Sequence, residues 1–164
     1  MVGNELAGPN DPVYVGINIA SGDAFLGAMR GNEALVDDNA DRIRPNVQLG
    51  DAPRFEDFRA RVGQELRRLQ PAGIGVARTR MYGNWTMANA SKRFGLEAAA
   101  MIAAEQEDFE CRLVTQEEAA KTVEVPIQSL AQALPGRLEI EPTPYWKDRA
   151  VAFLVAAHLA EEFG

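Results

Sequence analysis

The residues with the clearest chemical potential lie in one basic and aromatic segment, residues 78–95, which reads RTRMYGNWTMANASKRFG. It contains no acid, and its cationic side chains accompany a tyrosine and a tryptophan; the residues singled out are Arg78, Arg80, Lys92, Arg93, Tyr82 and Trp85. Cationic groups bind phosphates, and aromatic rings stack on bases. Two interpretations stay open: a ligand or nucleic-acid surface, or arginines that pair with surface acids while Trp85 packs against the core or a partner subunit.

Composition limits the classes of function. The chain has 17 Lys and Arg against 24 Asp and Glu, a net charge of −7, so it repels polyanions unless its cations gather on one face. One cysteine, Cys111, and one histidine, His158, leave no zinc spacing, and both are interpreted as structural. No apolar run is long enough for a membrane span and no leader is recognised, which predicts a cytoplasmic protein without membrane contact.

The elements that must position these residues follow from periodicity. Residues 1–12 are rich in Gly, Pro and Asn and are predicted to form a flexible tail before a single domain over residues 13–164. Period-two alternation and the Ser21-Gly22 turn predict a hairpin, with a third antiparallel strand over residues 33–36.

After residue 54 the chain alternates between helices and strands. The apolar stripe Phe55, Phe58, Val62, Leu66 and Leu69 predicts a helix. Strands are expected over residues 73–77 and 109–115, and helices over residues 92–108, 115–123, 126–134 and 144–163. The predicted fold class is α/β, with a mixed five-stranded sheet, its first three strands antiparallel, flanked by helices.

This order resembles the ribonuclease H-like superfamily, in particular its RuvC resolvase branch. The segments that carry the resemblance are VGINIASGDAFLGAM, LQPAGIGVARTRM, FGLEAAAMIAA and WKDRAVAFLVAAHLA. The segments RTRM and SKRFGLEAA are similar to those of a small bacterial family of RNase H-like domains, from which no activity carries over. The resemblance therefore implies a fold more than a chemistry.

The resemblance also implies where nuclease carboxylates would stand. Such nucleases hold two divalent ions between clustered acids. The first-strand aspartate corresponds to Asn18, the second-strand glutamate to Ala77 or Arg78, and the two terminal-helix acids to Tyr145 and Asp148. Only Asp148 is acidic, so no cofactor is expected. Asp23 and Glu97 are the candidates for a rebuilt site that would bind Mg²⁺ or Mn²⁺.

The prediction for function is a catalytically degenerate RuvC-like domain, a binding or regulatory module for a weakly bound nucleic acid or a protein partner, with a homodimer left open. Two alternatives are kept. One is an active metal-dependent nuclease with relocated carboxylates. The other is a small-anion or nucleotide-responsive domain that uses Arg78 and Arg80 as an anion clamp.

Overall fold

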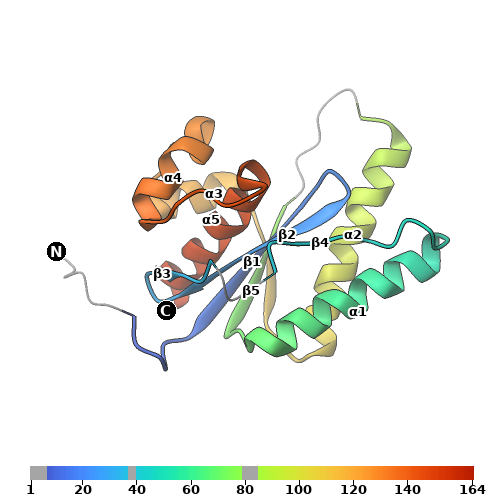
Figure 1. Ribbon diagram of the computed structural model, residues 1–164, viewed down its shortest axis with the longest axis horizontal. Coiled ribbons are helices and arrows are strands. Elements are labelled where there is room, and N and C mark those ends of the chain that lie inside the picture. Colours follow the sequence, from blue (N-terminus) through green and yellow to red (C-terminus); the bar gives the residue numbers. More distant parts are fainter. Residues whose placement is uncertain (1–6, 37–39, 79–84) are drawn as a thin grey trace.

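The structure is a computed structural model that describes residues 7–36, 40–78 and 85–164 (Figure 1). A six-stranded mixed sheet forms its centre, in the order β3-β2-β1-β5-β6, with β4 also paired to β2. The strands are β1 (Val13–Ala20), β2 (Asp23–Arg30), β3 (Glu33–Ala34), β4 (Arg42–Ile43), β5 (Gly73–Ala77) and β6 (Cys111–Val114).

The pairing confirms the predicted fold class. β1, β2 and β3 are antiparallel, whereas β5 is parallel to β1 and β6 is parallel to β5. The turn between β1 and β2 consists of Ser21 and Gly22, both with positive φ (53° and 79°), a backbone that suits the twist of a two-residue hairpin. β4 was not predicted, because a two-residue strand is too short to show alternation. The single domain over residues 13–164 stays a prediction, and the first half of the tail, residues 1–6, lies outside the described residues.

Helices cover both faces of the sheet (Figure 1). α1 (Asp51–Leu69) and α2 (Met87–Gln106) pack on one face. α3 (Gln116–Val123), the short 3-10 helix η1 (Ile127–Ser129), α4 (Leu130–Leu138) and α5 (Trp146–Phe163) cover the other. The predicted stripe of α1 is confirmed, since Phe58, Val62 and Leu66 are fully buried and Phe55 and Leu69 pack at the margin of the same core.

The start of α2 corrects one prediction. The helix begins at Met87 rather than at residue 92, so residues 87–91 belong to the helix and not to the loop before it. The Thr86 hydroxyl accepts a hydrogen bond from the Asn89 backbone N–H at 3.1 Å and caps the first turn. At α3, Thr115 and Glu118 form a capping box, in which each side chain accepts a hydrogen bond from the backbone N–H of the other residue.

A row of glycines brings α5 unusually close to the sheet. Gly16 of β1 pairs with Gly27 of β2 on one side and with Gly75 of β5 on the other. A Cβ atom on Gly16 would lie 1.9 Å from the Ala152 carbonyl oxygen, and one on Gly27 would lie 2.6 Å from the Phe153 nitrogen. The absence of side chains across three strands is what lets the helix backbone rest against the sheet.

Candidate functional site

The positions that the resemblance assigned to nuclease acids meet where β1 ends and α5 begins. Asn18 is 4% exposed, and its side-chain Nδ2 donates a hydrogen bond of 3.0 Å to the Asp148 backbone carbonyl. Asp148 lies in the first turn of α5. One step beyond the Ile17–Val76 pair, Asn18 lies beside Ala77 at the end of β5. The hydrogen bond of Asn18 thus links the sheet to the first turn of α5.

Tyr145 precedes α5 with a left-handed backbone, at φ 60° and ψ 29°. Its ring centroid is 6.0 Å from that of Phe25, and the Arg42 guanidinium carbon lies 4.0 Å from the centre of the Tyr145 ring. A cation over an aromatic face is attracted by the ring quadrupole. Tyr145 therefore places an aromatic ring where the resemblance implies an acid, and this ring makes a cation–π contact with Arg42.

Two arginines share the acid at the start of β2. The Arg42 Nη1 lies 3.5 Å from one Asp23 oxygen, and the Arg44 Nε lies 3.7 Å from the other. Burial raises the pKa of the Asp23 carboxyl above its ordinary value, and the nearby Asp148 adds to this rise, whereas Arg44 and Arg42 oppose it. The Arg44 side chain is 67% exposed and can still reach an anion in solvent.

These residues do not fit the two-metal site that the resemblance implies. Among the residues that the structure describes, no three His, Cys, Asp or Glu side chains are grouped so that they could hold a metal ion. Asp23 is engaged by arginines, and the Asn18 amide donates to a carbonyl. Glu97 is buried on α2, which packs on the sheet face opposite to α5. Hard divalent cations need several anionic oxygens, and cations beside Asp23 would repel them.

The basic and aromatic segment is divided between the end of β5 and the start of α2. Arg78 is exposed, and its backbone N–H donates to the Val114 carbonyl at 2.8 Å, which continues the ladder between β5 and β6. The half-buried Trp85 lies just before α2, with the Arg93 guanidinium 5.0 Å from its ring centre, and Lys92 is exposed. Arg80 and Tyr82 lie outside the described residues.

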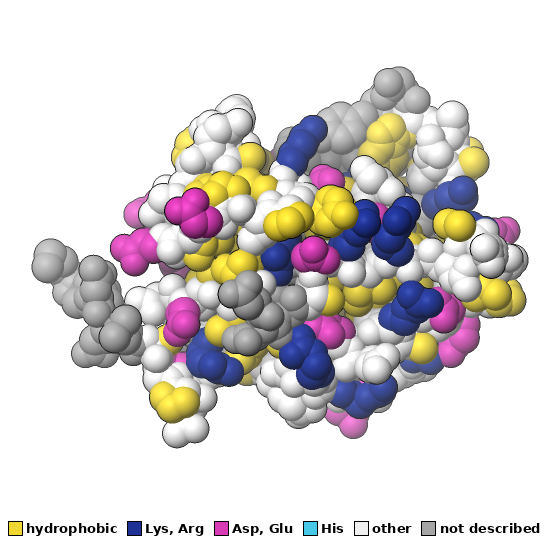
Figure 2. All heavy atoms as spheres, in the orientation of Figure 1, with side chains coloured by type: hydrophobic (Ala, Val, Ile, Leu, Met, Phe, Trp, Pro, Cys, Tyr) yellow, Lys and Arg dark blue, Asp and Glu magenta, His cyan; other side chains and the backbone are white. Residues whose placement is uncertain are grey.

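Sequence reasoning missed Arg42 and Arg44 as site residues. One signal was available, because Arg42, Ile43 and Arg44 alternate polar and apolar side chains as a strand does, and Ile43 is buried. Figure 2 shows Lys and Arg side chains spread over the face where β4, α1 and α2 lie in Figure 1, with fewer acids between them. This face combines cations from segments far apart in the chain.

The remaining titratable candidates have structural surroundings. The His158 Nδ1 lies 2.8 Å from the Thr122 hydroxyl, which ties α5 to α3. Burial, aided by Glu105, raises the pKa of the Cys111 thiol to about 11, so the reactive thiolate is rare at neutral pH. Neither residue belongs to the cluster around Asp23.

Comparison with known proteins identifies the fold. The structure is similar to Thermus thermophilus RuvC, with a TM-score of 0.72 and 19% identity over 91% of this chain and 93% of that chain. It is also similar to T. thermophilus RuvC in complex with a Holliday junction substrate, with a TM-score of 0.76 and 19% identity over 92% and 93% of the two chains.

A third structure, the yeast mitochondrial Holliday junction resolvase, gives a TM-score of 0.61 and 15% identity over 93% of this chain and 79% of that chain. No protein-family model matches the sequence, and neither does any curated protein. The chain therefore has the RNase H-like fold in its RuvC-like form. Within the described residues no helix is long and apolar enough to cross a membrane.

Proposed function

We propose that this chain is a binding module for single-stranded or branched nucleic acid and that it does not cleave what it binds. The observation that carries the proposal concerns the positions that the resemblance to RuvC assigns to nuclease acids. Neutral side chains stand at two of these positions, and arginines lie beside the nearby acid. Asn18 and Tyr145 occupy two of the acid positions, and Arg42 and Arg44 hold Asp23. A site that would attract metal ions is thereby turned into one that attracts phosphates.

The matched folds supply independent support. The similar structure of T. thermophilus RuvC is a complex with a Holliday junction substrate, so this fold presents a nucleic-acid surface in that protein. Arg44 and Arg78 are both exposed in this chain. The overall charge of −7 opposes general DNA affinity, so we expect weak binding that is confined to this face.

The test is a titration of single-stranded and four-way-junction DNA into the wild type and an Arg42→Gln, Arg44→Gln double variant. Each lost phosphate contact should flatten the slope of log K against log salt by roughly 0.7 to 0.9. The matched control is Arg61→Gln, an exposed arginine of α1 that pairs with Asp57 on the same helix. Equal, negligible binding by all three proteins would reject the nucleic-acid role. Binding of inorganic phosphate alone would favour the small-anion alternative.

Asp23 gives a prediction of opposite sign. Asp23→Asn removes the carboxylate that engages Arg42 and Arg44, so oligonucleotide affinity should rise and its salt dependence should steepen. Because the pKa of Asp23 is raised, acidification protonates it at a higher pH than an ordinary aspartate. Wild-type affinity should therefore increase as the pH falls into the range in which Asp23 becomes protonated, and the variant should lose this part of the pH dependence. Titrations at two pH values measure both effects, and lower affinity in the variant contradicts the reasoning.

A relocated nuclease site is the second candidate, since Asp23 and Asp148 are near enough for the charge of one to raise the pKa of the other. Calorimetric titration with Mg²⁺ and Mn²⁺ separates the two candidates. We expect no heat of specific binding and no cleavage of duplex, junction or hybrid substrates. Cleavage that disappears in Asp148→Asn would establish the nuclease instead.

The homodimer that the sequence left open is proposed here on the outer face of α2. Met87, Phe94 and Ile102 are 82%, 43% and 49% exposed, and their spacing places them on one side of the helix. A second copy would cover this stripe. Sedimentation of the wild type and a Phe94→Glu, Ile102→Glu variant tests it, and identical monomeric behaviour of both proteins would exclude this dimer.

A further inference from the structure

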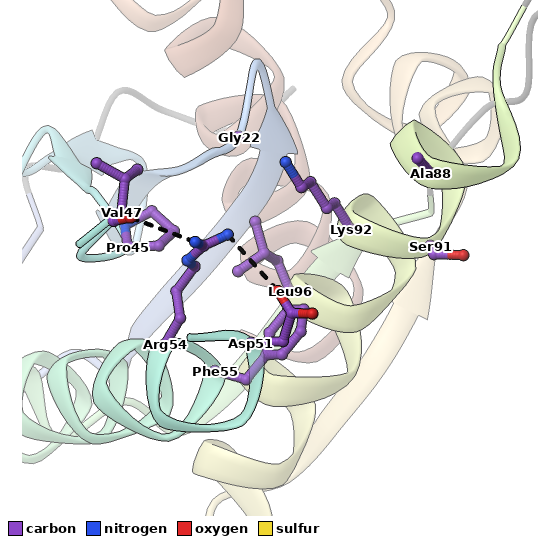
Figure 3. A pocket seen from close by; sticks show the side chains of 10 residues that line it. All are labelled: Gly22, Pro45, Val47, Asp51, Arg54, Phe55, Ala88, Ser91, Lys92 and Leu96. Carbon is purple, nitrogen blue, oxygen red and sulfur yellow. Dashed lines mark hydrogen bonds and ion pairs between the residues drawn. The ribbon is translucent and has the colours of Figure 1, made fainter. Parts of the chain in front are cut away.

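A cavity of about 370 Å³ lies next to the arginines of the proposed phosphate site. It is enclosed by the β1–β2 turn, the segment between β4 and α1, and the first turns of α1 and α2 (Figure 3). Gly22 of its wall precedes Asp23 in the chain, and Pro45 follows Arg44. A group in this cavity would therefore be a close neighbour of anything held at Arg44.

The lining joins flat apolar surface to positive charge. Pro45, Val47, Phe55 and Leu96 supply apolar surface, and Val47 is 76% exposed at the mouth. Figure 3 shows the Arg54 guanidinium and the Lys92 ammonium extending from opposite sides toward the same space. Asp51, the one acid among the described residues of the lining, is highly exposed, and its Oδ1 lies 3.9 Å from the Arg54 Nη1.

Two hydrogen bonds and one packing contact hold this shape. The Arg54 Nη2 donates to the carbonyls of Leu49 at 2.9 Å and Val47 at 3.3 Å, which fixes the plane of the guanidinium. Phe55 lies directly against the backbone of α2, because a Cβ on Gly95 would be 2.7 Å from its ring. A preformed slot of this kind costs little ordering on binding.

We infer that this cavity takes one unpaired nucleobase, whose phosphate lies at Lys92, from a strand held at Arg42 and Arg44. The inference rests on the proposed function and names the part of the nucleic acid that it recognises. The cavity volume of about 370 Å³ is close to the lower limit of small-ligand sites, which is about 300 Å³. This size suits one nucleotide. Aromatic rings and guanidinium planes both stack on bases, and the ammonium binds a phosphate as a point charge.

The experiment compares deoxyadenosine monophosphate with deoxyribose 5-phosphate, each titrated into the folded protein. If the base enters the cavity, the nucleotide should bind about 5- to 150-fold more tightly, the range expected for one stacked base. Ala88→Phe, which places a ring at the rim of the cavity, should remove this difference. Ala60→Phe, at an exposed alanine of α1 away from the cavity, should leave it unchanged.

A second pair of variants tests the phosphate contact. Lys92→Gln should weaken both small molecules several-fold, whereas Lys121→Gln on α3 should weaken neither. Circular dichroism should be used to check that all four variants are folded. Equal affinity for the two small molecules in the wild type, or a difference that survives Ala88→Phe, overturns the inference.

The two proposals fail in different ways. If single-stranded DNA binds and Arg42→Gln, Arg44→Gln weakens it while Ala88→Phe does not, the cavity is not used and the proposed function stands. If the nucleotide binds with the expected base dependence but the polymer does not, the cavity stands and the polymer surface is wrong. Absence of binding by both ligands overturns both proposals.

Discussion

Gly16→Ala tests the close approach of α5 to the sheet, on which the geometry of the candidate site depends. The added Cβ would lie 1.9 Å from the Ala152 carbonyl oxygen and 2.9 Å from the Ala156 nitrogen. Ordinary contacts of a Cβ begin at 3.4 Å, so one of the two backbones must move by about 1.5 Å. A backbone carbonyl in a helix cannot rotate aside as the end of a flexible side chain can.

The cost follows from this displacement. Overpacking a core typically costs about 1–3 kcal/mol, and alanine in place of a strand glycine returns about 0.5–1 kcal/mol. Since α5 would carry its own fully buried side chains, such as Phe153 and Leu154, away from the sheet, we expect the upper end of the overpacking cost, which leaves about 2 kcal/mol net. For a chain of 164 residues this corresponds to a Tm lower by roughly 4–8 °C.

Urea and thermal unfolding followed by circular dichroism measure the change. The matched control is Gly136→Ala in α4, where nothing lies within 4 Å of the added Cβ and alanine is the better helix former. That variant should be as stable as the wild type or more stable by up to about 1 kcal/mol. A Gly16→Ala protein within about 0.5 kcal/mol of the wild type would refute the close packing of α5 on β1.

Two further predictions concern buried polar groups. Asn18→Asp replaces an amide donor to the Asp148 carbonyl with a buried acid, so it should cost about 3 kcal/mol at neutral pH in urea unfolding. Burial and Asp148 should raise the pKa of the new acid, so the cost should shrink as the pH falls; an equal loss at pH 7.5 and pH 5 would contradict this. For Cys111, whose thiol pKa is raised from 9.0 to about 11, a colorimetric disulfide reagent at pH 8 should react roughly a hundredfold more slowly than with the urea-unfolded chain. Equal rates would show that the thiol is not shielded.

The sequence pattern predicted those elements that carry an apolar stripe or a continuous apolar run. The stripe from Phe55 to Leu69 fixed α1, and the buried run at residues 73–77 indicated β5. The start of α2 was misplaced because residues 87–89 are exposed and show no apolar stripe, and because Asn89 stands three residues after Thr86 in place of the Glu or Gln of a capping box.

The candidate site was predictable only where positions on long, regular elements could be carried over from the resemblance. Asn18 and Asp148 could be placed by resemblance because both lie on long, regular elements. Arg42 and Arg44 were missed because their place depends on a two-residue strand paired with β2. The cavity at Lys92 depends on how α1 and α2 cross at Phe55 and Gly95, which no local pattern records.

The glycine row also has a consequence for the order of folding. Gly16, Gly27 and Gly75 all belong to the first half of the chain, whereas the helix that covers them comes last among the described elements. The hydrogen bond between Asn18 and Asp148 joins residues 130 positions apart. During synthesis β1, β2 and β5 can pair well before α5 is available, and they then present a strip of bare backbone to solvent. Packing α5 on these strands is slow, because bringing together residues so far apart in the chain costs conformational entropy. A partly folded chain would therefore be prone to aggregate through this strip.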